Sequence, residues 1–161
     1  MVLIVMGVTG AGKSTIGRAL ATALGWEFHD GDDLHTAASK RKMHRGIALN
    51  DADRAPWLSA IRKLIQFMLS EGRNGVVACS ALKQSYRDEV VVDPSLVKVV
   101  YLKGSKQLIA ARLRKRSRHF MNPALLQSQF DTLEEPRDAI VVDISMAPDA
   151  IVNAISTRLG L

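Results

Sequence analysis

The chain has 161 residues, of which 47% are hydrophobic and 24% are charged, and its formal net charge at pH 7 is +6. These values are typical of one globular domain over residues 1–161 and exclude a disordered chain. No apolar run approaches the about 20 residues that a membrane-spanning helix needs, and residues 2–6 are too short for a signal-peptide core. We therefore expect a cytoplasmic protein with no membrane partner. The lone cysteine, Cys79, excludes an internal disulfide.

A phosphate-binding loop is predicted close to the first residue. Residues 7–14 read G-x-x-x-x-G-K-S, follow the apolar run 2–6, and precede apolar residues at helical spacing, Ile16, Leu20 and Leu24. Strand, glycine-rich loop and helix form the context of a P-loop, in which backbone N–H groups and a helix N-terminus bind phosphate oxygens. The expected nucleotide contacts are Gly7, Val8, Thr9, Gly10, Ala11, Gly12, Lys13, Ser14 and Thr15.

Two side chains of this loop have distinct expected roles. Lys13 can reach the β- and γ-phosphates as a mobile cation, and the Ser14 hydroxyl can ligate Mg²⁺. The alternative is a glycine-rich turn that matches by chance, but the flanking strand and helix argue against it. The NKxD-type motif that reads guanine is absent. The sequence therefore predicts ATP and Mg²⁺ as cofactors.

Five short apolar runs alternate with helical patterns along the chain. Strands are expected at residues 2–6, 26–29, 76–79, 97–102 and 140–143. One helix is expected to end near residue 24, a second to cover residues 40–46, and a third to begin near Pro56. Further helices are expected to include residues 86–87, 108–113, 125–130 and 151–159. This alternation predicts an α/β fold of three layers, a parallel sheet with helices on both faces. Ligands of such sheets bind beyond the carboxyl ends of the strands.

Asp30 and Asp32 follow the second predicted strand. Residues i and i+2 of an extended segment point the same way, so both carboxylates are expected to face the phosphates. One would support Mg²⁺, and the other would accept a proton from an acceptor hydroxyl. The alternative is a solvated Asp-rich turn. Asp143 ends the fifth predicted strand like a Walker B carboxylate, but we prefer Asp30 for the metal and interpret Asp143 as a loop-capping residue.

Residues 94–130 contain no Asp or Glu but eight Lys and Arg residues. This basic stretch is a solvated face, a nucleic-acid surface, or a cover for a small polyanionic ligand. The third interpretation is favoured because the P-loop already implies such a ligand. Aromatic residues make up only 5% of the chain and show no stacking pattern for RNA, so no nucleic-acid partner is expected.

Several other side chains have a structural and a functional interpretation. Arg54, Lys83 and Arg87 lie near predicted strand ends or turns, where they are either solubilising charges or ligand-binding cations. Trp57 is interpreted as a core anchor and Cys79 as a small buried hydrophobic residue. The four histidines lack the spacing of zinc ligands.

Longer blocks of the sequence together resemble the gluconokinase family. Two of them are far more specific than the P-loop: L-N-D-A-D-R-A-P-W-L at residues 49–58 and C-S-A-L-K-Q-S-Y-R-D at residues 79–88. The resemblance extends from the P-loop to the last predicted strand. The remaining blocks are F-H-D-G-D-D-L-H at 28–35, K-M at 42–43, Y-L-K-G at 101–104, H-F-M at 119–121 and Q-F-D-T-L-E-E-P at 129–136.

This resemblance implies a small P-loop kinase of the shikimate-kinase and nucleoside-monophosphate-kinase type. Its parallel sheet would have the order 2-3-1-4-5, and a mobile helical lid at about residues 112–124 would cover ATP. The implied reaction is ATP-dependent phosphorylation of the C6 hydroxyl of D-gluconate to 6-phosphogluconate, by a homodimer. Shikimate kinases carry a glycine-rich turn after the third strand, and the residues Ser80, Ala81 and Leu82 at this place argue against shikimate as substrate.

The resemblance also assigns expected roles to individual residues. Asp32 would be the general base, with Lys13 and the lid residue Arg116 as catalytic cations, and Ser14 and Asp30 would hold the metal. Arg112, Arg116 and Pro148 would add contacts to the nucleotide. It leaves open which of Arg54, Lys83 and Arg87 binds the gluconate carboxylate. The expected substrate-binding residues are Asp32, His35, Arg54, Lys83, Arg87 and His119.

Two rival functions are compatible with the sequence. One is a kinase for another small polyol acid or for shikimate. The other is a nucleotide sensor or RNA-binding module without catalysis, which would use the basic stretch and would show a steep salt dependence of binding.

Overall fold

The computed structural model of the protein describes residues 1–116 and 123–161. Five strands form one sheet in which every neighbouring pair is parallel, and their order is β2-β3-β1-β4-β5. The predicted parallel sheet and its order are therefore confirmed. The strands are β1 (Val2–Met6), β2 (Glu27–Asp30), β3 (Gly75–Ala78), β4 (Val97–Lys103) and β5 (Ile140–Asp143).

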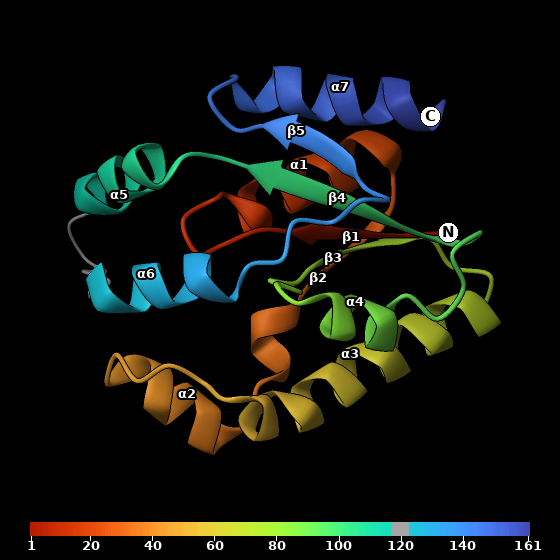
Figure 1. Ribbon diagram of the computed structural model, residues 1–161. Coiled ribbons are helices and arrows are strands. Elements are labelled where there is room, and N and C mark those ends of the chain that lie inside the picture. Colours follow the sequence, from red (N-terminus) through yellow and green to blue (C-terminus); the bar gives the residue numbers. More distant parts are fainter. Residues whose placement is uncertain (117–122) are drawn as a thin grey trace.

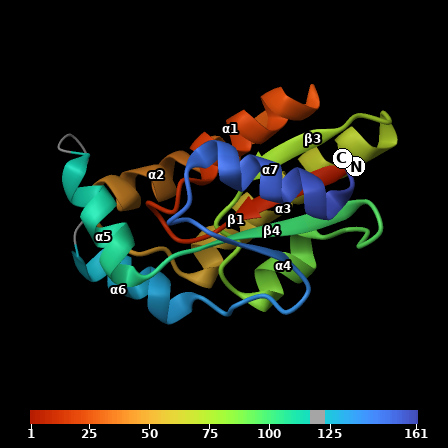
Figure 2. The same ribbon diagram turned by 90° about the horizontal axis from the view of Figure 1, so that it is seen from above.

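Helices cover both faces of this sheet (Figure 1). In Figure 1, α1 and α7 lie on one side of the strands and α3 and α4 on the other, whereas α5 and α6 lie beyond the strand tips, at the end opposite to both termini. Figure 2 shows the same arrangement from above. The helices are α1 (Lys13–Leu24), α2 (Ala37–His44), α3 (Asp51–Ser70), α4 (Gln84–Val90), α5 (Lys106–Lys115), α6 (Pro123–Thr132) and α7 (Pro148–Leu159), with a 3-10 turn η1 (Gly31–Leu34) after β2.

The central strand β1 shows why the sheet has two cores. Alternate side chains of a strand point to opposite faces. Leu3 and Val5 belong to the apolar cluster with α1 and α7, while the other three residues of β1 belong to the cluster with α3 and α4. All five are fully buried, as expected for a parallel strand that is covered on both faces.

Two predicted helix boundaries are wrong, and capping explains both. The third helix begins at Asp51 rather than near Pro56, because Asn50 and Asp53 form a reciprocal capping box that satisfies backbone N–H groups at the start of the helix. Pro56 consequently lies in the second turn. Helix α2 begins at Ala37 because the Thr36 side chain accepts a hydrogen bond from the backbone N–H of Ser39.

Other sequence predictions agree with the fold. The first helix ends at Gly25, whose φ of 67° is the left-handed conformation of a helix C-cap. Trp57 and Cys79 are buried as predicted. Within residues 1–116 and 123–161, no helix is long and apolar enough to cross a membrane.

Candidate active site

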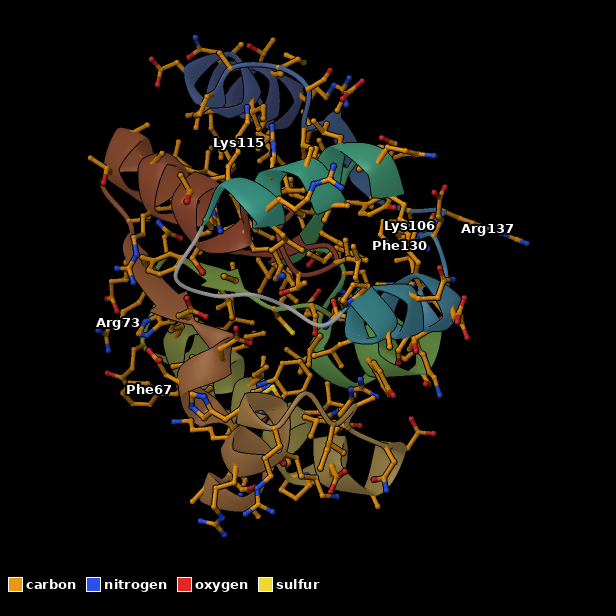
Figure 3. The ribbon with its side chains drawn as sticks, turned by 90° about the vertical axis from the view of Figure 1, so that its left-hand side faces the viewer. Phe67, Arg73, Lys106, Lys115, Phe130 and Arg137 are labelled. Carbon is orange, nitrogen blue, oxygen red and sulfur yellow. The ribbon has the colours of Figure 1, made fainter. Side chains whose placement is uncertain are left out.

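A cavity of about 1050 Å³ opens at the carboxyl ends of the strands. It joins the P-loop to η1, to the segment between α2 and α3, and to α5 and α6. Figure 3 views the molecule from this side, with Lys115, a residue of the cavity wall, near the end of α5. Parallel α/β sheets bind their ligands in this region. The wall includes Thr9, Gly10, Lys13, Asp32, His35, Arg54, Ser80, Arg116 and Gln129.

The P-loop has the backbone geometry that the sequence predicts. Gly10 and Gly12 have φ values of 77° and 94°, which favour glycine. A Cβ atom at Gly10 would also lie 3.0 Å from Cγ of Leu113 on α5. The Lys13 ammonium donates a hydrogen bond to the carbonyl oxygen of Val8 at 3.0 Å. Burial lowers the pKa of Lys13, although the nearby Asp32 carboxylate opposes this effect.

Ser14 and Asp30 bring two side-chain oxygens together beside the P-loop. The Ser14 hydroxyl donates to Oδ2 of Asp30 at 2.6 Å, so the two side chains meet as predicted. Mg²⁺ prefers oxygen ligands and usually takes only one or two from the protein, leaving the rest to water and phosphate. This pair therefore fits Mg²⁺. The described residues contain no group of three or more His, Cys, Asp or Glu side chains that could hold a metal.

Asp32 reaches the cavity by a route that differs from the prediction. The chain turns at once after Asp30 into η1, so Asp30 and Asp32 do not share an extended segment, and that expectation is wrong. The Asp30 carboxylate caps this turn by accepting from the backbone N–H of Asp32 at 3.1 Å. The Asp32 side chain is 68% exposed and lies in the cavity wall.

His35 lies beside Asp32 and is held by Trp57. The two rings stack with centroids 4.4 Å apart, and the Trp57 indole N–H donates to the carbonyl oxygen of Gly31 at 2.7 Å. His35 Nε2 is 3.8 Å from the nearer oxygen of Asp32. Burial lowers the pKa of His35, so the neutral ring is favoured. Trp57 thus anchors the core and also fixes the turn that carries Asp32.

Arg54 is the cation among the three candidates that lines the cavity. Its guanidinium donates to the Tyr86 hydroxyl at 3.2 Å, and Tyr86 in turn donates to the Asp51 carboxylate. Lys83 is paired with the same carboxylate at 3.0 Å. The hydrogen bonds from Tyr86 and Lys83 lower the pKa of Asp51. This network ties the start of α3 to the start of α4.

The expectation that Arg87 binds substrate is not supported by its surroundings. Arg87 is only 3% exposed, and its guanidinium donates to the carbonyl oxygens of Ala81 and Leu82 at 2.9 and 3.1 Å. It therefore holds the turn after β3 instead of facing the cavity. Lys83 is likewise absent from the described cavity wall because its ammonium is turned to Asp51. Ala81 has φ +42°, a left-handed conformation in a turn that lacks glycine.

A second cavity of about 330 Å³ lies on the other side of the P-loop. Arg112, Arg116, Met146 and Pro148 contribute to its wall together with Thr15 at the start of α1. Arg116 lines both cavities. Met146 and Pro148, which lie between β5 and the start of α7, are thus next to the P-loop.

Three other residues singled out by the sequence analysis are Arg112, Asp143 and His119. Arg112 donates a hydrogen bond to the carbonyl oxygen of Ile144. Asp143 accepts from the backbone N–H of Ser145 at 2.8 Å, which confirms its predicted capping role. His119 and part of the predicted lid lie outside the described residues.

Several cavity residues escaped the sequence analysis. His44 and Arg45 lie in the cavity wall at the end of α2, and the strongly basic segment 40–46 was the available signal. Gln129 also lines the cavity. Gln129 begins the block Q-F-D-T-L-E-E-P, but nothing local to that block reveals that its side chain meets the P-loop.

The chain is similar to known kinases over nearly its whole length. The family model for shikimate kinase matches residues 9–154. A gluconokinase from Arabidopsis thaliana is 43% identical over 96% of this chain and 89% of its own length. A gluconokinase from Gluconobacter oxydans is 42% identical over 95% of this chain and 88% of its own length.

A solved structure agrees with these relatives. The crystal structure of a gluconokinase from Sinorhizobium meliloti 1021 superimposes with a TM-score of 0.89 at 42% identity, over 98% of this chain and 90% of that protein. The similarity therefore extends over nearly the whole chain.

Proposed function

Because the chain belongs to the shikimate kinase-like P-loop kinases and, within them, to the gluconokinase family, we propose that it transfers the terminal phosphoryl group of ATP to D-gluconate. The hydroxyl that accepts this group is the one at C6, so the products are ADP and 6-phosphogluconate. The second cavity would receive the adenine, and the first would hold the triphosphate end and the sugar acid.

One observation carries this proposal: a single cavity contains the P-loop lysine, an acidic side chain and an arginine guanidinium. Lys13, Asp32 and Arg54 all contribute to its wall. A phosphoryl donor site, a proton acceptor and a carboxylate-binding group are the three parts that phosphorylation of a sugar acid requires. A simple nucleotide sensor needs only the first.

The acceptor side of the reaction rests on Asp32 and Arg54. Asp32 would take the proton from the C6 hydroxyl as its oxygen forms a bond to the γ-phosphorus and the bond to the β,γ-bridging oxygen breaks. Arg54 would pair with the gluconate carboxylate, since a guanidinium matches a carboxylate with two parallel hydrogen bonds. The Tyr86 hydroxyl oxygen accepts a hydrogen bond from the Arg54 guanidinium at 3.2 Å and so helps to orient it.

The donor side of the reaction rests on the P-loop and on the end of α5. Ser14 and Asp30 would hold Mg²⁺, which neutralises phosphate charge when it is bound. Lys13 and Arg116 would stabilise the negative charge on the transferring group, and Arg112 would help to close off water near the nucleotide.

The test is ADP release from ATP and Mg²⁺ with a panel of acceptors: gluconate, shikimate, several sugar acids, free sugars and no acceptor. We expect release only with gluconate, and ³¹P and ¹³C NMR of the product should locate the phosphate at C6. Release with shikimate would make the chain a shikimate kinase and remove gluconate as the substrate. Nucleotide binding without acceptor-dependent release would leave a sensor.

A further inference from the structure

Helix α6 presents one face to the main cavity. Leu125, Ser128 and Gln129 line the cavity at spacings of three and four residues, which places them on one side of a helix. Leu126 points away from them into the core beside α1 and α7. The cavity face of α6 is therefore a defined surface whose most polar member is Gln129.

The Gln129 side chain is hydrogen-bonded to the P-loop. Its Oε1 accepts from the backbone N–H of Thr9 at 2.6 Å, across 120 residues of sequence. A backbone N–H is only a donor, so the side-chain atom that faces it must be the oxygen. The orientation of the amide is thereby fixed by chemistry, and its NH₂ group points away from Thr9.

The two N–H donors of this NH₂ group have no acceptor among residues 1–116 and 123–161, in which Gln129 makes only the bond to Thr9 through its side chain. Gln129 belongs to the wall of the cavity, where Lys13 and Arg116 also lie. A ligand oxygen that carries negative charge is the acceptor these surroundings favour.

Helix α6 is also fixed at its far end, which gives the amide a defined position. The backbone N–H of Glu134 donates to the carbonyl oxygen of Leu82 at 2.8 Å, and the Glu134 carboxylate accepts from the backbone N–H of Gln84 at 2.7 Å. These bonds attach the chain after α6 to the turn after β3. Helix α6 and the residues after it are therefore held both to the P-loop, through Gln129, and to the turn after β3, through Glu134.

We propose that Gln129 is a ligand-binding residue whose amide, oriented by the Thr9 N–H, donates hydrogen bonds from Nε2 to an oxygen of the reacting ligands. This oxygen belongs either to the transferring phosphoryl group or to the acceptor molecule. A contact with the acceptor molecule rests on the proposed kinase function. A contact with the phosphoryl group does not, because nucleotide binding can be measured without an acceptor.

Two substitutions separate the donor from the anchor. Gln129→Glu has nearly the same shape and keeps an oxygen for the Thr9 N–H but loses the NH₂ donors. Gln129→Met removes both hydrogen bonds at similar size. Gln127→Glu is the matched control, since it adds the same charge to the same helix at an exposed residue outside the described cavity wall.

The measurements are kcat and KM for ATP and gluconate, the Kd of AMP-PNP by titration calorimetry, and the thermal unfolding of each variant. We expect both Gln129 variants to lose about 10- to 100-fold in kcat/KM, with Gln127→Glu within twofold of the unsubstituted protein. A loss confined to the KM of gluconate assigns the contact to the acceptor. Weaker AMP-PNP binding or a lower kcat assigns it to the phosphoryl group.

Two patterns would overturn the proposal. Loss in Gln129→Met with near-normal activity in Gln129→Glu would mean that only the Thr9 anchor matters. Loss in Gln129→Glu with near-normal activity in Gln129→Met would mean charge repulsion without a contact. If the unsubstituted protein does not act on gluconate, the proposed function fails. The Kd of AMP-PNP in the same variants then decides the role of Gln129. A tenfold weaker affinity supports a contact with the nucleotide, and unchanged affinity rejects it.

Discussion

Asp32 depends on one tight turn for its place in the cavity. The turn begins at Gly31, where an added Cβ would lie 2.5 Å from the carbonyl oxygen of Ala78 on β3. Only glycine permits this close approach of the two backbones. The Trp57 indole N–H also holds this turn by donating a hydrogen bond to the Gly31 carbonyl oxygen. The position of the proposed base is therefore set by the close packing of Gly31 as well as by the hydrogen bond from the Asp32 N–H to Asp30.

Replacement of Asp32 by asparagine tests its role as proton acceptor. Asp32→Asn keeps the shape of the side chain but removes its basicity, so we expect kcat to fall by at least about 100-fold with little change in nucleotide affinity. Steady-state kinetics and AMP-PNP titration measure the two quantities. Asp33→Asn, at the exposed neighbouring residue, is the control and should be near normal. A near-normal rate in Asp32→Asn would remove Asp32 as the base.

Arg116 lines both cavities, as does its neighbour Lys115. If it stabilises charge that develops on the transferring group, Arg116→Ala should lower kcat by about 100-fold and raise the KM for ATP far less. Arg114→Ala changes an exposed arginine two residues earlier on α5 and should leave both constants unchanged. The reverse pattern, a large rise in KM at normal kcat, would identify Arg116 as a ground-state contact.

At the scale of single elements, α3 organises the acceptor side of the cavity. It carries Arg54 and Trp57, and its first turn is connected to α2 through the Lys42–Asp53 ion pair at 2.8 Å and to α4 through Asp51. The capping box of Asn50 and Asp53 decides where this helix begins. The cap consequently sets the register in which Arg54 faces the cavity.

Loss of this cap should be visible as a loss of stability. Asn50→Ala removes the side-chain acceptor of the Asp53 N–H at 2.8 Å, and we expect the free energy of unfolding to fall by about 1 kcal/mol. Chemical denaturation measures it. Lys63→Ala, in the exposed middle of the same helix, is the control, because lysine and alanine have similar helix propensities. Equal stability of Asn50→Ala and the unsubstituted protein would show that the cap contributes nothing.

At the scale of the whole molecule, five carboxylates have pKa values below their ordinary values of 3.8 or 4.5 because they accept hydrogen bonds in the folded state. A carboxylate of this kind stabilises the fold above its ordinary pKa, and this stability is lost as the pH falls through the folded value. The five are Glu27, Asp51, Asp53, Asp93 and Asp143.

Stability should therefore fall in acid in two stages. Burial lowers the pKa of His35 below 6.5; the charges of Arg54 and Lys40 lower it further, and that of Asp32 raises it. His35 is therefore protonated in the unfolded chain at a higher pH than in the folded protein, so stability begins to fall as the pH drops below 6.5. The carboxylates add a steeper fall below about pH 4.5. Thermal melts from pH 8 to pH 3 measure both stages. The first stage should vanish in His35→Gln, and a melting temperature that does not change between pH 8 and pH 3 would contradict both.

The homodimer that the family resemblance implies stays a prediction. Exposed large apolar side chains occur at several places, among them Phe67 and Leu96, which are 52% and 43% exposed. Figure 3 shows Phe67 beside Arg73, whose guanidinium carbon lies 5.6 Å from the Phe67 ring. Sedimentation equilibrium of the purified chain measures its oligomeric state directly.

Local patterns in the sequence are sufficient to predict the P-loop, the five strands and the parallel sheet. Each of these depends on signals within about ten neighbouring residues: glycine spacing, apolar runs and alternation with helices. The same holds for Ser14 and Asp30, because Ser14 belongs to the P-loop pattern and Asp30 ends the second strand. The sheet order 2-3-1-4-5 required the family resemblance.

Which polar side chains face the cavity depends on tertiary contacts. Arg54, Lys83 and Arg87 are alike in sequence, but Tyr86 and Asp51 orient the first two, and the carbonyl oxygens of the turn after β3 hold the third. Gln129 meets Thr9 across 120 residues. A hydrogen bond over such a separation depends on how helices pack on the sheet, and no local pattern in the sequence encodes that packing.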